Sequence, residues 1–149
     1  MDGCYDLCHS GHFNAIRQAS NAVHTLCIGP NSDEQVLRYK GPTILTGPER
    51  TEIVSALKWG DVVIPDTPYE TTIETLDKFN CQYYIHGDDP VMCDGVNVCI
   101  VLQEMNRFKE IRRTTGISTT DLTGRLLKLI QTNEGQEEEK EESDRVAER

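Results

Sequence analysis

Short apolar runs alternate along the chain with amphipathic segments, and turn residues such as Gly41-Pro42 separate them. The apolar runs predict short strands at Thr25–Gly29, Val62–Ile64, Gln82–Ile85 and Phe108–Ile111. The amphipathic segments predict helices at Phe13–Ala19, Pro48–Trp59 and Tyr69–Phe79. Alternating short strands and helices favour an α/β fold with a parallel sheet and crossover helices.

The loops that follow the predicted strands contain most of the candidate chemistry. In parallel sheets of this kind, ligands bind beyond the carboxyl ends of the strands. Four segments would lie on that edge of the sheet: Gly3–Asp6, Gly29–Asn31, His86–Asp89 and Arg113–Ser118.

Two histidines three residues apart, in His9-x-Gly11-His12, precede the first predicted helix. On the first turn of a helix this spacing places both imidazoles on one face, near free backbone N–H groups. Glycine lets a ligand approach the backbone closely, and a helix N-terminus attracts anions. The motif therefore indicates a phosphate site. A metal site and an ordinary helix start with solvated histidines are the alternatives.

A second segment, Arg112–Asp121, places arginines before a glycine turn and then a helix start. Ser118 and Asp121 form a Ser-x-x-Asp pattern, which is typical of a helix N-terminus. Arginine forks and hydroxyl groups at such a position also suit phosphates. The alternative is a capped surface helix with solvated arginines.

Together the two segments resemble the cytidylyltransferase family, within the larger group of HxGH nucleotidyltransferases. The resemblance covers about residues 2–130 and is greatest for the N-terminal catalytic repeat of the members that use ethanolamine phosphate. It rests on Asp2–Asp6, His9–His12, Tyr39–Pro42, Glu49-Arg50, Leu57–Trp59, Pro68–Lys78, His86–Asp89 and Arg113–Leu122. It implies a Rossmann-like, doubly wound parallel sheet of the HxGH nucleotidyltransferase type. We expect the first strand of that sheet to be missing, because one residue precedes Asp2.

The resemblance also implies the reaction and its residues. CTP and phosphoethanolamine would give CDP-ethanolamine and pyrophosphate, a step in phosphatidylethanolamine synthesis. The implied catalytic residues are His9, His12, Lys40 and Arg113. The implied nucleotide-binding residues are Cys4, Tyr5, Asp6, Gly11, His86, Gly87, Asp88, Asp89, Gly116, Ile117, Ser118, Thr119 and Thr120. Mg²⁺ is implied with CTP and would be held by phosphates and water, so we expect no protein metal ligands.

The composition gives the chain a net negative charge, and acidic residues are concentrated in a C-terminal tail. The formal net charge is −10, and residues 133–149 contain eight acidic but only three basic residues. We expect a domain over 1–132, followed by an acidic tail over 133–149 that is disordered or a frayed helix. The acidic charge argues against nucleic-acid binding. The sequence contains no apolar run long enough to span a membrane, no secretory signal and six cysteines without a Cys-x-x-Cys motif, so we expect a cytoplasmic protein.

Several interpretations stay open. Lys40 could be a solvated loop lysine, Asp6 a local capping group, and Asp88 and Asp89 the start of a turn. Where the family carries polar, aromatic and cationic groups, this chain has Asn97, Cys99 and Gln103. Together with the missing strand, these departures allow a catalytically inactive or truncated relative that binds CTP or dimerises. Activity on another phospho-alcohol, a homodimer and pairing with a second cytidylyltransferase repeat are further alternatives.

Overall fold

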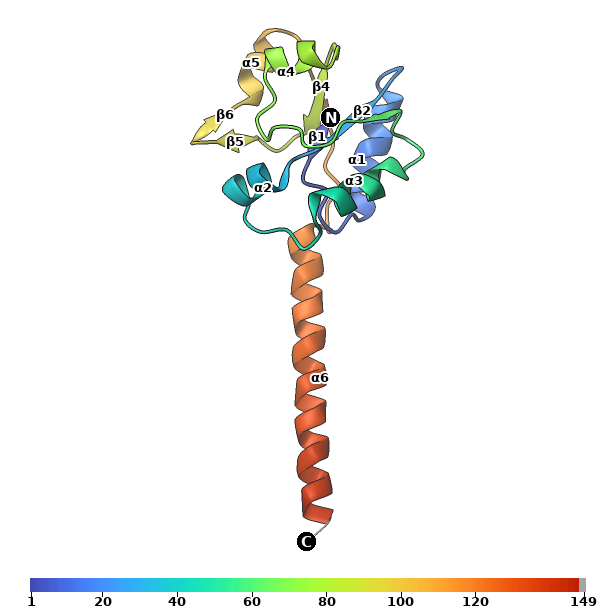
Figure 1. Cartoon of the computed structure of the whole chain (residues 1–149), viewed down its shortest axis with the longest axis vertical. Coiled ribbons are helices and arrows are strands. Elements are labelled where there is room, and N and C mark those ends of the chain that lie inside the picture. The colour runs from blue at the N-terminus through green and yellow to red at the C-terminus, as the bar shows by residue number, and fades with distance from the viewer. Residues whose placement is uncertain (148–149) are drawn as a thin grey trace. The chain divides into compact units, whose positions relative to one another are not determined.

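The computed structural model describes the backbone of residues 1–147 and the side chains of residues 1–133 (Figure 1). The chain forms two compact units, one over Met1–Gly116 and one that begins at Ile117. The strands of the first unit are β1 (Asp2–Gly3), β2 (Cys27–Pro30), β3 (Val62–Val63), β4 (Tyr84–Gly87), β5 (Met92–Cys93), β6 (Val96–Asn97) and β7 (Phe108–Ile111). Its helices are α1 (Ser10–Asn21), α2 (Asp33–Tyr39), α3 (Gly47–Ser55), α4 (Ile73–Lys78) and α5 (Cys99–Glu104).

The strands form two parallel sheets and one antiparallel hairpin. The parallel sheets have the orders β1-β2-β3 and β4-β7, and β5 pairs with β6. Helices connect the parallel strands, as the alternating pattern predicts, so the mixed α/β fold class is confirmed. The predicted strand at Phe108–Ile111 coincides with β7.

The expectation that the first strand is missing was wrong. A short β1 is present, and Asp2 pairs in parallel with Gly29 of β2. β1 is only two residues long, and it forms no backbone ladder with β4 that would join the two parallel sheets. A side-chain hydrogen bond connects them instead: the Tyr84 hydroxyl of β4 donates to Asp2 Oδ1 at 2.6 Å.

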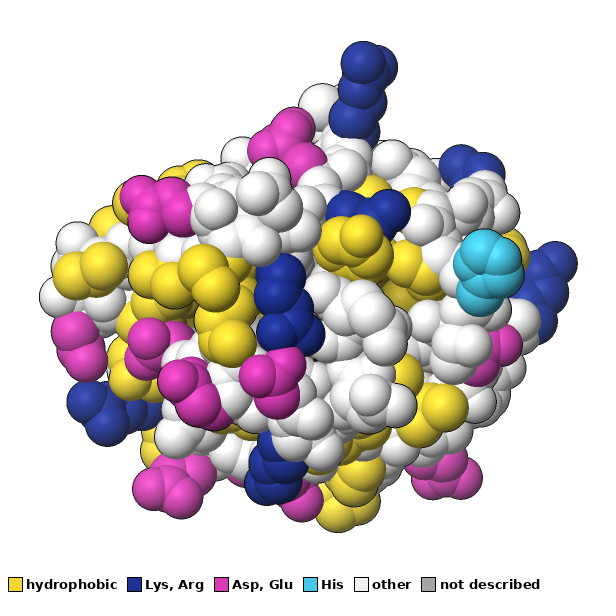
Figure 2. Space-filling model, turned by 90° about the horizontal axis from the view of Figure 1, so that it is seen from above, with side chains coloured by type: hydrophobic (Ala, Val, Ile, Leu, Met, Phe, Trp, Pro, Cys, Tyr) yellow, Lys and Arg dark blue, Asp and Glu magenta, His cyan; other side chains and the backbone are white. Residues whose placement is uncertain are grey.

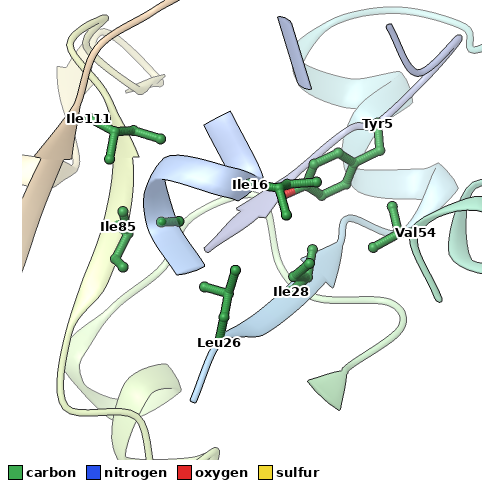
Figure 3. Close-up of a cluster of buried hydrophobic side chains, with 8 residues drawn as sticks. Tyr5, Ile16, Leu26, Ile28, Val54, Ile85 and Ile111 are labelled. Carbon is green, nitrogen blue, oxygen red and sulfur yellow. The ribbon is translucent and has the colours of Figure 1, made fainter. Parts of the chain in front are cut away.

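Two hydrophobic clusters lie on opposite faces of the β4-β7 sheet, because neighbouring side chains along a strand point to opposite sides. One cluster contains Ile85 and Ile111 together with Ile16 of α1 and Val54 of α3. Figure 3 shows these side chains converging with Tyr5, Leu26 and Ile28. The other cluster contains Tyr84 with Leu76 of α4, Leu102 of α5 and the buried Cys93 and Cys99. Helices therefore cover both faces, which is the doubly wound arrangement.

Some predicted boundaries differ from the structure. Helix α4 starts at Ile73 rather than at Tyr69, because the Thr72 hydroxyl accepts a hydrogen bond from the Thr75 N–H and caps the helix there. Helix α3 ends at Ser55, four residues before Trp59. Helix α2, the β5-β6 hairpin and α5 were not predicted. Exposed apolar side chains occur on this hairpin and on α5. They include Met92, Val96, Ile100, Val101 and Met105. Hydrophobic groups gather at the left of Figure 2, which is the side where Figure 1 shows the hairpin and α5.

The second unit consists mainly of the long helix α6 (Thr119–Ala147). The Asp121 N–H donates to the Ser118 hydroxyl at 3.1 Å, which confirms the helix start predicted from the Ser-x-x-Asp pattern. Much of the acidic tail over 133–149 lies outside the described side chains, so the division at residue 132 stays a prediction. Among the described residues, none of the helices combines the length and the apolar character that crossing a bilayer requires.

Candidate functional site

The two motif histidines form a reciprocal cap at the start of α1. His9 is the N-cap residue, and its Nδ1 atom accepts a hydrogen bond from the Gly11 N–H at 3.1 Å. The Nδ1 atom of His12 accepts from the His9 backbone N–H at 3.3 Å. Since both Nδ1 atoms accept, the neutral form of each ring has its proton on Nε2. The cap thus fixes two imidazoles as potential Nε2–H donors at a helix N-terminus.

His12 is held in its neutral form. Burial, followed by the charges of His9 and Lys40, lowers the pKa of His12 to about 4. The two imidazole rings lie 4.0 Å apart between centroids, so protonating both would place two positive charges side by side. At neutral pH His12 can donate a hydrogen bond to a phosphate oxygen without carrying a full charge.

Lys40 lies near these histidines although it is 28 positions away from His12 in the sequence. It is the C-cap residue of α2, and its charge acts on both His12 and the Cys4 thiol. Its ammonium nitrogen lies 5.8 Å from the centroid of the Tyr69 ring. The fold therefore brings together three residues expected at the site, Cys4, His12 and Lys40.

Tyr5 and Asp6 support the loop between β1 and α1 from inside the protein. Tyr5 is almost fully buried and belongs to the first hydrophobic cluster. The Asp6 carboxylate accepts hydrogen bonds from the backbone N–H groups of Ile44 and Leu45, both at 2.9 Å. These contacts tie the loop that precedes His9 to the loop that follows Lys40.

The second motif contacts both α1 and the end of β4. The Asn14 amide of α1 donates to the Thr114 hydroxyl at 2.9 Å. The Arg113 N–H donates to Asp88 at 3.3 Å, and the Arg113 guanidinium forms an ion pair with Asp89. The predicted cytidine segment and the predicted phosphate-binding arginine are therefore neighbours. In this state the Arg113 charge is paired with a carboxylate.

The remaining expected residues surround this region or lie in the second unit. His86 and Gly87 end β4, and His86 Nδ1 lies 3.2 Å from the Gly87 carbonyl oxygen. Gly116 has φ +79°, a left-handed conformation that suits glycine, and closes the first unit. Ile117, Ser118, Thr119 and Thr120 belong to the second unit, where Ser118 caps α6.

A carboxylate that we did not assign to the site from the sequence lies close to it. Asp2 accepts hydrogen bonds from the hydroxyl groups of Thr71 and Tyr84. Its negative charge, acting in addition to burial, raises the pKa values of Tyr69 and Tyr84. Tyr69 also stacks on Tyr39 with 4.9 Å between ring centroids. Tyr69 therefore lies near a positive charge, that of Lys40, and near the negative charge of Asp2.

The described residues contain no preformed metal centre. No group of three or more His, Cys, Asp or Glu side chains in this part of the chain is arranged to hold a metal ion. All six cysteines are free thiols.

The family model for cytidylyltransferase-like proteins matches residues 1–125. The chain belongs to the cytidylyltransferase-like family. Among its relatives, ethanolamine-phosphate cytidylyltransferase of Mus musculus is 43% identical over 138 residues, which cover 92% of this chain and 34% of the relative. The protein of the same name from Arabidopsis thaliana is 42% identical over 135 residues, covering 87% and 32%. This cytidylyltransferase-like chain thus spans about a third of the length of these curated relatives.

A solved structure supports the fold. The lipopolysaccharide core biosynthesis protein from Thermoplasma volcanium GSS1 matches with a TM-score of 0.60 and 18% sequence identity. The match covers 76% of this chain and 92% of that one. At this identity the likeness concerns the fold alone, and it agrees with a Rossmann-like architecture for the cytidylyltransferase-like domain.

Proposed function

We propose that this domain transfers the cytidylyl group of CTP to phosphoethanolamine, giving CDP-ethanolamine and pyrophosphate. Family membership and the names of the relatives support the reaction class and the substrates. The paired motif histidines, the adjacent Lys40 and the arginine-bearing second motif would supply the donors that a triphosphate requires. The reaction would serve phosphatidylethanolamine synthesis.

The proposed chemistry is a single in-line displacement. An oxygen of the phosphoethanolamine phosphate forms a bond to the α-phosphorus of CTP. The bond from that phosphorus to the bridging oxygen breaks, and pyrophosphate leaves with the electron pair. No covalent enzyme intermediate is needed, so the protein has to position the two substrates and stabilise the charge that develops.

Each donor has a proposed role in this step. The Nε2–H groups of His9 and His12 would donate to the α-phosphate and the departing pyrophosphate. Lys40 would bind the phosphate that attacks, and Arg113 would exchange its ion pair with Asp89 for a phosphate contact. In the second unit, Ser118, Thr119 and Thr120 carry hydroxyl and backbone donors of the kind that bind phosphates at a helix start. Cys4, Gly11 and His86–Asp89 would line the nucleotide pocket.

One observation supports phosphoethanolamine in particular: Lys40 and Asp2 act on the same ring, Tyr69, with opposite charges. Phosphoethanolamine is a zwitterion with a negative phosphate and a positive ammonium group. Its phosphate would pair with Lys40, and its ammonium group would bind Asp2 next to the faces of tyrosine rings. A cation and an anion near Tyr69 are the two charges that such an acceptor would need.

Magnesium is proposed as part of the substrate. We assign Mg²⁺ to the CTP complex, where phosphate oxygens and water would hold it. We propose, further, that the protein acts in the cytoplasm, where its six free thiols stay reduced. The domain over 1–132 would work alone, as a homodimer or beside a second cytidylyltransferase repeat.

The proposal is tested by measuring pyrophosphate release from CTP and Mg²⁺ with phosphoethanolamine, with phosphocholine and without an acceptor. We expect release that depends on phosphoethanolamine and forms CDP-ethanolamine in equal amount. Equal or greater turnover with phosphocholine would overturn the substrate assignment. CTP binding by calorimetry without turnover would instead support a nucleotide-binding relative that lacks activity.

A further inference from the structure

Arg50 of α3 is fully buried, although its guanidinium is charged. Burying a cation is costly unless hydrogen bonds and an anion compensate it. Arg50 Nη1 donates to the Cys4 carbonyl at 2.5 Å, and Nη2 donates to the Asn31 carbonyl at 2.8 Å. The Asp33 carboxylate pairs with the same Nη2 atom at 2.6 Å. The side chain therefore links three separate segments of the first unit.

The two carbonyl groups mark the place where the site is built. Cys4 follows β1 directly, and Asn31 follows β2 directly. These are the carboxyl ends of two neighbouring parallel strands, where ligands of such sheets bind. Carbonyl oxygens at this edge would repel phosphate oxygens, and Arg50 engages two of them. The guanidinium thus ties these two carbonyl groups together from inside the protein.

Arg50 also connects the edge of the sheet to the start of its own helix. The second carboxylate oxygen of Asp33 accepts a hydrogen bond from the Gly47 N–H at 2.9 Å. The charge of Arg50 acts on the Cys4 thiol, as the charge of Lys40 does. Arg50 therefore contacts the loop that leads to His9 from the protein interior, and Lys40 lies close to the same loop.

We infer that Arg50 is a positioning residue of the phosphate site, which holds the loop after β1 and the end of β2 in the geometry that aligns His9 and His12 with CTP. This inference rests on the proposed function. Arg50 itself does not touch the substrate, because its side chain is enclosed by protein. Its two Nη groups are held by protein carbonyls and a carboxylate.

Arg107 is a matched control, because it lies at the amino ends of strands rather than at their carboxyl ends. Arg107 precedes β7 and binds one aspartate and two carbonyl groups, just as Arg50 does. It donates to Asp77 at 2.6 Å, to the Cys81 carbonyl at 2.5 Å and to the Gln82 carbonyl at 3.0 Å. Because these contacts lie at the amino ends of β4 and β7, Arg107 stabilises the fold away from the expected ligand edge.

The experiment compares Arg50→Lys and Arg107→Lys with the wild-type chain, at a temperature where circular dichroism shows all three folded. Each variant keeps the charge and loses the fork of donors. We expect both to lower the melting temperature. We expect Arg50→Lys to lower kcat/KM for CTP by about tenfold or more and Arg107→Lys to change it by less than about twofold. The KM for phosphoethanolamine should stay the same in both variants.

Calorimetric titration with CTP in the presence of Mg²⁺ provides a second measurement on the same proteins. If the wild type binds CTP but does not turn over, the proposed reaction is wrong, and weaker CTP binding in Arg50→Lys than in Arg107→Lys still supports the inference. Equal effects of the two variants on turnover and on binding would overturn it. A folded wild type that neither binds nor converts CTP would overturn both proposals.

Discussion

The backbone N–H of His9 donates to Nδ1 of His12 at 3.3 Å, so each motif histidine helps to fix the other. Nδ1 of His9 is occupied in turn by the Gly11 N–H. The same two atoms that cap the helix thus determine which ring nitrogen is left to donate. One structural device therefore serves both helix initiation and the proposed chemistry.

His12→Ala should lower kcat by about 100-fold or more, because it removes a donor that acts on the charge developing in the transition state. His24→Ala is the matched control, since His24 is exposed and belongs to neither motif. Steady-state pyrophosphate release, with folding checked by circular dichroism, measures the effect. Similar kcat values for the two variants would exclude His12 from the chemistry.

Stability should depend on pH through His12. Its folded pKa of about 4 lies below the usual value of 6.5, so the unfolded chain binds a proton more readily than the folded one. The stability associated with the neutral ring is complete above about pH 6.5 and is lost as the pH falls toward 4. The loss amounts to about 3 kcal/mol at most.

Urea unfolding at several pH values between 4 and 7.5 measures this dependence. His12→Gln should show a shallower fall in the free energy of unfolding than the wild type over that range. Carboxylates whose pKa values are lowered, such as Asp33, contribute to both proteins and cancel in the difference. Parallel curves for the two proteins would contradict the assignment.

Local sequence patterns were sufficient to predict the helix start and the strand on either side of the second motif. The cap of α6 at Ser118 and the strand at Phe108–Ile111 follow from short-range patterns, and the structure has both. Helix α5 was missed because it is one short element, Cys99–Glu104, after an unpredicted hairpin. At its start the Cys99 N–H donates to Asn97 Oδ1, and this contact does not follow a standard capping pattern.

Long-range relationships could not be predicted in the same way. Lys40 acts on His12 because α2 ends near α1, and no periodicity reveals this neighbourhood. Asp2 and Arg50 lie in the segments that resemble the family. Their roles, however, depend on partners that are distant in sequence: Tyr84 for Asp2 and Cys4 for Arg50. A buried arginine is especially hard to recognise, since arginine is mostly found at the surface.

Leu102→Ala should destabilise the first unit by about 2–5 kcal/mol, because it leaves a cavity in the second hydrophobic cluster. Leu102 is only 1% exposed, whereas Leu37 is 61% exposed and serves as the control. Leu37→Ala should change the free energy of unfolding by less than about 0.5 kcal/mol. Urea denaturation of both variants measures the difference, and equal stabilities would mean that α5 does not pack as described.

Asp2→Asn should raise the KM for phosphoethanolamine by about tenfold or more and leave the KM for CTP unchanged. The amide keeps a hydrogen-bond acceptor for the Tyr84 hydroxyl, but it removes the negative charge that would bind the ammonium group. Asp66→Asn, at an exposed loop position, is the control and should leave both KM values as they are. Steady-state kinetics with each substrate varied in turn separates the two constants. Because the predicted effect concerns the amine alone, a parallel rise in both KM values would indicate a general distortion of the site and would contradict the role of Asp2.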